Sequence, residues 1–178
     1  MLEGALVNLR AQEAADFERL HRWINDREVA RYLDARYEAS LAFEEGWMAR
    51  RAGTPHSLTG ANFAIETKDG QHIGGIGLRE GSPEDRTAWL AMLIGEKEYW
   101  SRGYGSDALR TLLGFAFGEM NLHRVDLDVY DFNARGIAAY RKCGFVEEGR
   151  RRHARYHDGA YHDVIKMSVL RAEWPPAG

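Results

Sequence analysis

Three strand-like segments that follow one another closely between residues 62 and 95 constrain the fold most. They read NFAIET, HIGGIGLRE and RTAWLAMLIG, and β-branched, aliphatic and aromatic residues dominate them. The first two are joined by a short turn that contains Asp69-Gly70, a strong hairpin signal, and GSPED separates the second from the third. Because strands joined by such short connections pair antiparallel, we predict an antiparallel meander in the middle of the chain.

The segments on either side of the meander carry helical and strand patterns in turn. Phe17, Leu20 and Ile24, for example, recur at intervals of three or four residues, as on the buried face of a helix. In chain order the expected elements are a strand at 5–10, helices at 14–33 and 40–51, the meander, a helix at 103–120, a strand at 123–130, a helix at 134–142, and two strands within 145–170 joined at Asp158-Gly159.

This order predicts a mixed α/β fold. We expect a single domain spanning 1–178, in which helices flank a central, mostly antiparallel sheet of about seven strands. Residues 172–178, which end in EWPPAG, are expected to form a frayed tail.

Composition narrows the class of protein. The 178 residues suffice for one domain with its own core, and the formal net charge of −3 argues against a dedicated nucleic-acid-binding protein. No apolar run reaches the length of a membrane span, and the early charges argue against a signal peptide. We therefore expect a cytoplasmic protein that binds neither nucleic acid nor a membrane. The lone Cys143 excludes an internal disulfide and is interpreted as a small core residue.

A glycine-containing segment, SRGYGSDA at residues 101–108, opens the helix predicted at 103–120. Backbone N–H groups at such a turn can converge on a phosphate, helped by the positive end of the helix. A P-loop is excluded because no lysine follows the glycines. Gly103, Gly105 and Ala108, with Asp126 further on, match a dinucleotide-binding fingerprint, but the flanking meander and hairpin are not a run of βαβ units. The other interpretations are a cradle for the pyrophosphate of coenzyme A and an ordinary helix N-terminus.

Two motifs resemble those of the GNAT superfamily of acyl-CoA-dependent N-acetyltransferases. Residues 100–105, WSRGYG, are similar to its motif A, [QR]-x-x-G-x-[GA], except that Trp100 replaces the polar first residue. Residues 133–145, NARGIAAYRKCGF, are similar to its second signature, N-x-x-[AG]-x-x-x-Y-x-[KR]-x-G-F. Together with WINDREVARYL near the start, they make nearly the whole chain resemble the branch that contains ribosomal-protein alanine and spermidine acetyltransferases.

The resemblance implies that acetyl-CoA is a cosubstrate, that no metal takes part, and that a primary amine attacks the thioester directly. The acceptor would be a protein N-terminus, a polyamine or a small amine, and homodimers are common among such enzymes. The alternatives are a non-catalytic acyl-CoA-binding sensor on the same fold and a dinucleotide-binding oxidoreductase.

Coenzyme A would be held by the motif and by the strand before it, which is bulged in the family and pairs with the pantetheine arm. Main-chain amides from Arg102 to Ser106 would bind the pyrophosphate. Asn133 would contact the pantetheine, although it also suits the N-cap of the helix at 134–142. The full set implied to bind the cofactor is Leu93, Ile94, Trp100, Ser101, Arg102, Gly103, Tyr104, Gly105, Ser106, Asn133 and Arg141.

The catalytic residues implied are Tyr140 and Glu80. Tyr140 matches the tyrosine that lies beside the sulfur of coenzyme A, and an unperturbed phenol with a pKa of ~10 is protonated at neutral pH and can act as an acid. Relatives often carry a glutamate base where this chain has Trp89, so the base is not carried over directly. Glu80, Asp26 and Glu28 are candidates by their expected location near the acceptor groove, as is a chain of water molecules. Asp26, Glu28 and Trp89 are expected to bind the substrate, with the two acids forming a negative mouth that attracts a cationic amine.

A histidine-rich segment near the C-terminus invites a metal-site interpretation. His153, His157 and His162, with Asp158 and Asp163, lie on both sides of a predicted hairpin turn, and their spacing does not suit a set of ligands. Strand alternation also divides the basic segment 150–155, RRRHAR, between two faces, so we interpret it as a solvated or cofactor-adjacent strand.

Overall fold

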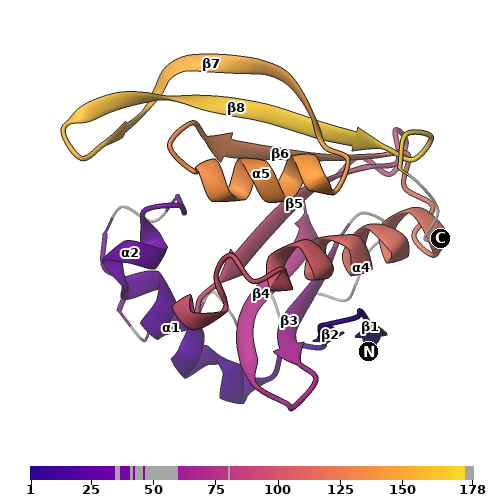
Figure 1. The fold of residues 1–178 in the computed structure, drawn as a ribbon, viewed down its shortest axis with the longest axis horizontal. Coiled ribbons are helices and arrows are strands. Elements are labelled where there is room, and N and C mark those ends of the chain that lie inside the picture. Colours follow the sequence, from indigo (N-terminus) through magenta and orange to yellow (C-terminus); the bar gives the residue numbers. More distant parts are fainter. Residues whose placement is uncertain (35–36, 41, 43–45, 47–59, 80, 175–178) are drawn as a thin grey trace.

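The computed structural model of the protein describes residues 1–34, 37–40, 42, 46, 60–79 and 81–174. Within them, eight strands form one sheet in the order β1-β2-β3-β4-β5-β6-β8-β7 (Figure 1). All neighbouring strands are antiparallel except β5 and β6, which are parallel. The strands are β1 (Leu2–Glu3), β2 (Val7–Arg10), β3 (Ala61–Thr67), β4 (His72–Arg79), β5 (Thr87–Ile94), β6 (Arg124–Tyr130), β7 (Val146–His157) and β8 (Ala160–Leu170).

The mixed α/β fold with a mostly antiparallel sheet is therefore confirmed, and one strand was missed. That strand is β1, which has two residues and is too short to show a period in the sequence. The helices are α1 (Phe17–Asn25), α2 (Arg27–Ala30), α4 (Tyr104–Gly118) and α5 (Ala134–Lys142), with 3-10 turns at Ala14–Asp16 and Lys97–Tyr99. The helix expected at 40–51 lies mostly outside the described residues.

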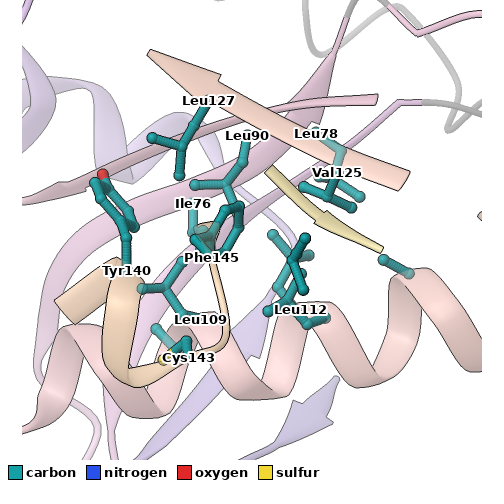
Figure 2. Packing of buried hydrophobic residues seen from close by; sticks show 14 of the residues in the cluster. Ile76, Leu78, Leu90, Leu109, Leu112, Val125, Leu127, Tyr140, Cys143 and Phe145 are labelled. Atoms are coloured by element: carbon teal, nitrogen blue, oxygen red, sulfur yellow. The ribbon is translucent and has the colours of Figure 1, made fainter. Parts of the chain in front are cut away.

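The helices cover both faces of the sheet. Figure 1 shows α4 and α5 lying together over one face. Leu109 and Leu112 of α4 are fully buried and share a core with Leu90, Leu127 and Tyr140, as Figure 2 shows. On the opposite face a smaller apolar cluster joins α1 and α2 to the sheet, where Leu20, Trp23 and Val29 pack with Leu93 and Trp100. The two packing faces hold β5 firmly from both sides.

The first turn of α4 is tied to the N-terminal segment by one carboxylate. Asp107 is buried, and its side chain accepts hydrogen bonds from the backbone N–H groups of Ala5, Leu6 and Val7 at 3.3, 2.7 and 3.1 Å. A Cβ at Gly4 would lie only 2.5 Å from this carboxylate, so glycine permits the close approach. These three hydrogen bonds hold the start of α4 against the N-terminal segment.

Strands β5 and β6 separate soon after they meet. They pair only through Thr87–Trp89 and Arg124–Asp126, whereas β5 continues on β4 as far as Ile94 and β6 continues on β8 as far as Tyr130. Among the described residues, the later part of β5 therefore has no strand partner on its β6 side. A dinucleotide-binding fold would need a parallel sheet built from consecutive βαβ units, and this mixed sheet excludes that interpretation.

The C-terminal segment turns back onto α4. Trp174 packs against Phe117 with ring centroids 5.6 Å apart, and its backbone N–H donates to the carbonyl of Leu170. Residues 172–174 are thus held in place rather than frayed, and 175–178 lie outside the described residues. No helix in the described part of the chain combines the length and the apolar character needed to cross a membrane.

Candidate functional site

A cavity of about 1120 Å³ occupies the gap between β5 and β6. Leu90 and Val129, which belong to the core beneath α4 and α5, line it together with their sequence neighbours Trp89 and Asp128. Successive side chains of a strand point to opposite faces of its sheet. Because residues of both faces line one cavity, the cavity passes through the gap from one side of the sheet to the other.

The glycine motif forms one end of this cavity. Gly103 is the N-cap of α4 with a φ of +90°, and Ser101 before it has a φ of 58°, so the chain makes a tight left-handed turn into the helix. Ser101, Gly103, Gly105 and Ser106 all line the cavity. The first N–H groups of a helix have no partner within it, and they carry the positive end of its dipole. The turn can therefore hold a phosphate group with main-chain donors.

Trp100 replaces the family's polar residue but still donates a hydrogen bond. Its indole Nε1–H donates to the carbonyl of Ile94 at 2.7 Å, which ties the motif to the end of β5. The guanidinium of Arg135, from α5, lies 3.7 Å from the centroid of the Trp100 ring. Both Trp100 and Arg135 line the cavity. Arg135 of α5 thus places a positive charge beside the glycine motif.

Three of the residues expected to bind the cofactor do not line the cavity, although two of them, Arg102 and Tyr104, were expected to bind through their main-chain amides. Arg102 is exposed and donates to the carbonyl of Glu98, and Tyr104 packs edge-on against Tyr99. Neither side chain lines the cavity. Arg141 forms an ion pair with Glu147 and lines a different, smaller hollow.

The structure instead brings Arg135 and Lys142 to the cavity. Both belong to the second signature, NARGIAAYRKCGF, whose basic residues were the only sequence signal for them. Helical geometry turns Lys142 toward the cavity and the adjacent Arg141 away from it, because neighbouring residues do not share a helix face.

Asn133 serves as the N-cap of α5 and also lines the cavity. Its side-chain oxygen accepts a hydrogen bond from the N–H of Gly136 at 2.9 Å. A Cβ at Gly136 would lie 2.6–2.9 Å from the Asn133 amide, so the glycine makes this contact possible. Capping and contact with a ligand are compatible because the amide has further donors.

Strand β5 presents Leu93 and Ile94 to the cavity. At its end the N–H groups of Gly95 and Glu96 both donate to the carbonyl of Ile73, at 2.9 and 3.3 Å, so two residues lie opposite one, as in a β-bulge. The β4–β5 register is regular from Gly74↔Ile94 to Arg79↔Trp89. The irregularity therefore lies just beyond the paired part of the strand. What exposes the backbone of β5 is the divergence of β6.

Tyr140 lies in the wall of the cavity. Its ring is buried against Phe145, at 5.8 Å between centroids, and packs on Leu109 and Leu127 (Figure 2). Burial raises the pKa of the Tyr140 phenol to about 12, because the charged phenolate is poorly solvated there. The hydroxyl is therefore protonated throughout the neutral range.

The proposed acceptor residues divide into two groups. Trp89 lines the cavity, whereas Asp26 and Glu28 do not. Both acids pair with the ammonium of Lys97, at 2.8 and 2.7 Å, and the hydrogen bond from Lys97 lowers the pKa of Asp26. Lys97 offsets one of their two negative charges, and neither acid lines the cavity at which the negative mouth was expected. Glu80 lies outside the described residues.

The histidines near the C-terminus have individual partners. His157 pairs with Asp158 at 3.1 Å, and His162 pairs with Asp131 at 3.2 Å. Within the described residues, no group of three or more histidine, cysteine or acidic side chains is arranged to hold a metal ion.

Comparison with known proteins identifies the family. The model of the acetyltransferase (GNAT) domain matches residues 7–146. The chain belongs to the GNAT acetyltransferase family. A spermidine N(1)-acetyltransferase from Vibrio cholerae serotype O1 is 28% identical over 169 residues, which cover 94% of this chain and 95% of the relative. A putative ribosomal N-acetyltransferase from Bacillus subtilis is 34% identical over 106 residues, covering 60% of this chain and 57% of that protein.

Solved structures agree with this assignment. The crystal structure of spermidine N-acetyltransferase from Vibrio cholerae in complex with CoA and spermine matches with a TM-score of 0.86 and 26% identity. The match covers 95% of this GNAT chain and 98% of the Vibrio chain. This protein is thus an N-acetyltransferase of the GNAT family, and the resemblance recognised in its two motifs is confirmed.

Proposed function

We propose that this GNAT enzyme transfers the acetyl group of acetyl-CoA to a primary amine by direct attack. The observation that supports this best is the single cavity that joins the α4 N-terminus, the unpaired side of β5 and Tyr140. Such a passage lets a donor enter from one side of the sheet and an amine from the other. Holding two reactants in this way replaces an encounter in solution with a reaction between bound neighbours.

The donor would be bound chiefly by backbone groups. The first-turn N–H groups of α4, from Gly103 to Ser106, suit a pyrophosphate, and the unpaired side of β5 at Leu93 and Ile94 suits an extended amide-containing arm. Arg135 adds a positive charge, and Asn133 adds an amide. When bound, acetyl-CoA supplies an acetyl group activated as a thioester.

Tyr140 would act as the proton donor. Its hydroxyl carries a proton throughout the neutral range because burial raises its pKa to about 12. A thiolate that leaves the acetyl group needs a proton, and a phenol within reach can supply it. The attacking nitrogen loses one proton as it becomes an amide, and this proton returns to Tyr140 through water in the cavity that Tyr140 lines.

Direct attack is favoured because the only cysteine is unsuited to form an acyl-enzyme. Cys143 is buried, and its thiol donates to the carbonyl of Ser106 at 3.5 Å. Burial also raises the pKa of the Cys143 thiol, which disfavours the nucleophilic thiolate. The amine must therefore reach the thioester itself.

Two measurements test the proposal. Thermal unfolding with acetyl-CoA and with NAD should show stabilisation by acetyl-CoA alone. Release of free thiol should then be followed across a panel of amines at a fixed acetyl-CoA concentration. Stabilisation by acetyl-CoA without thiol release on any amine would favour a non-catalytic acyl-CoA-binding sensor. No stabilisation by acetyl-CoA would refute both the enzyme and the sensor.

A further inference from the structure

A short segment at the end of α2 crosses the gap between β5 and β6 on the face opposite α4 and α5. This segment, residues 29–34, is called the strap below. At its start, Val29 is buried in the apolar cluster that includes Leu93 of β5 and Trp100. At its end, Asp34 reaches Arg155 of β7, and β6 and β8 lie between β5 and β7 in the sheet. Four residues of the strap line the cavity, namely Val29, Tyr32, Leu33 and Asp34.

Arg155 holds the far end of the strap with two hydrogen bonds. Its Nη1 donates to the Asp34 carboxylate at 2.7 Å, and its Nη2 donates to the carbonyl of Leu33 at 3.0 Å. The guanidinium also lies 4.8 Å from the centroid of the Tyr130 ring, at the end of β6. Because a guanidinium is planar and its donors have fixed directions, two bonds to one segment fix the orientation of that segment as well as its distance.

The burial of Arg155 is unfavourable for stability. Only 4% of its side chain is exposed, whereas 88% of the Asp34 side chain is exposed. The Nε–H of Arg155 is buried and has no hydrogen-bond partner in the described part of the chain. His162, its cross-strand neighbour on β8, faces the Asp131 carboxylate at 3.2 Å instead. Apolar residues in place of such a buried ion pair are often equally stable or more so. A contact that served stability alone would therefore not need this arginine.

The other contacts of the strap with the far side of the gap are more exposed or less directional. Arg31 approaches Asp158 at 3.8 Å, and both side chains are exposed to solvent. Exposed ion pairs of this kind contribute little. Tyr32 packs on Phe132 with ring centroids 6.2 Å apart, a contact that does not fix a direction. The two bonds from Arg155 therefore decide where the end of the strap lies.

We propose that Arg155 is a positioning residue for the acceptor, because it holds the strap in place as a wall of the acceptor half of the cavity. This inference rests on the proposed function, since it concerns the acceptor of the same reaction. An amine that attacks a thioester must be held close to it and correctly oriented. Without the two bonds, the acceptor half would lose a fixed wall. The donor half, formed by α4 and α5, would keep its shape.

The substitution Arg155→Met tests the proposal in the whole protein, since it keeps an apolar stem and removes both hydrogen bonds. Thiol release is measured first against the concentration of the best amine in the panel, and then against that of acetyl-CoA. We expect kcat/KM for the amine to fall at least about tenfold, chiefly through KM, while KM for acetyl-CoA stays within about twofold of the parent value. Arg155→Lys should recover part of the loss, because its ammonium can still pair with Asp34.

Limited proteolysis measures release of the strap without any substrate. Trypsin cleavage after Arg31 is followed by mass spectrometry, and it should be at least about threefold faster in Arg155→Met than in the parent protein. Arg152→Met is the matched control for both measurements. Arg152 is an exposed residue of the same strand and does not line the cavity, so its replacement should change neither value.

Asp34→Ala supplies a second variant that removes the contact from its exposed end. It should raise KM for the amine in the same way, and it tests the proposal even if Arg155→Met does not fold. The double variant should be no worse than Arg155→Met alone, because both substitutions break one contact. Effects that multiply would show that the two residues act separately, and would overturn the proposal.

The outcomes separate this inference from the proposed function. If either KM for the amine or the rate of cleavage after Arg31 is unchanged in Arg155→Met, the inference is wrong while the proposed function stands. If this variant lowers kcat and the melting temperature with both KM values unchanged, Arg155 is only structural and the inference is again wrong. If acetyl-CoA binds to the parent protein but no amine releases thiol, the proposed function fails and this inference fails with it.

Discussion

The substitution Gly103→Ala tests whether the left-handed turn at the start of α4 is built for glycine. Gly103 has a φ of +90°, and a Cβ added there would meet only Leu6 Cδ1, at an ordinary 3.5 Å. The cost is therefore conformational rather than steric. An L-residue in the left-handed region costs roughly 1–2 kcal/mol, so we expect the free energy of unfolding to fall by about that amount. For a domain of this size, the melting temperature should fall by roughly 2–8 °C.

Gly114→Ala is the matched control in the same helix. Gly114 lies inside α4, and its added Cβ would contact Trp174 at 3.6 Å, an ordinary van der Waals distance. Alanine in a helix is favoured over glycine by roughly 0.5–1 kcal/mol, so this variant should be more stable than the parent protein. The two substitutions add the same methyl group and should have opposite effects.

Urea and thermal unfolding measure both variants, with and without acetyl-CoA. Gly103→Ala should also reduce the stabilisation by acetyl-CoA, because a relaxed turn would move the first-turn N–H groups that we expect to bind the pyrophosphate. If Gly103→Ala is as stable as Gly114→Ala, the strain argument is wrong. If acetyl-CoA also stabilises Gly103→Ala as much as the parent protein, the proposed binding of the pyrophosphate at this turn is wrong.

Three other predictions concern the cavity wall. Tyr140→Phe should keep acetyl-CoA binding and lower kcat at least about tenfold, and full turnover would remove the phenol from the mechanism. Trp100→Phe keeps an aromatic ring but loses the 2.7 Å hydrogen bond to the carbonyl of Ile94. The free energy of unfolding should fall by about 1 kcal/mol, and acetyl-CoA should bind more weakly. If neither value changes, this hydrogen bond does not hold the motif against β5. Burial raises the pKa of Tyr140 from 10.0 to about 12, so its stabilising contribution is complete below pH 10 and is lost as the pH approaches 12. The raised pKa is checked by measuring kcat against pH for the parent protein and for Tyr140→Phe. If kcat of the parent falls below pH 10 and this fall is absent in Tyr140→Phe, the pKa of Tyr140 is not raised.

The parts of the fold that depend on neighbouring residues could be predicted from the sequence. Gly70 and Gly159 adopt φ values of +85° and +81°, as the Asp-Gly hairpin turns require. The helix expected at 103–120 is observed at Tyr104–Gly118, because its leucine stripe needs one buried face. The glycine turn before it was also recognisable, because its conformation depends on the residues of the turn itself. The sequence by itself thus determined the elements and the glycine turn.

The charge of the site was decided by residues far apart in the chain. Lys97 pairs with Asp26 and Glu28, about 70 positions earlier, and thereby offsets one of the two negative charges expected from those acids. Arg135 reaches Trp100 from another helix, and Lys166 reaches Trp89 from another strand. A local pattern shows that a residue is charged but not which distant residue it will meet.

The divergence of β5 and β6 also depends on residues that are distant in the chain. Nothing in either strand's sequence shows that their pairing stops at Trp89, because that depends on β4 and β8 holding them from outside. Side chains on opposite faces come to line one cavity only because of this separation. The sequence alone therefore determined the glycine turn at the start of α4, which we propose binds a phosphate. Only the tertiary structure decided what it faces, because the gap and its charges arise from packing between strands and helices that are distant in the chain.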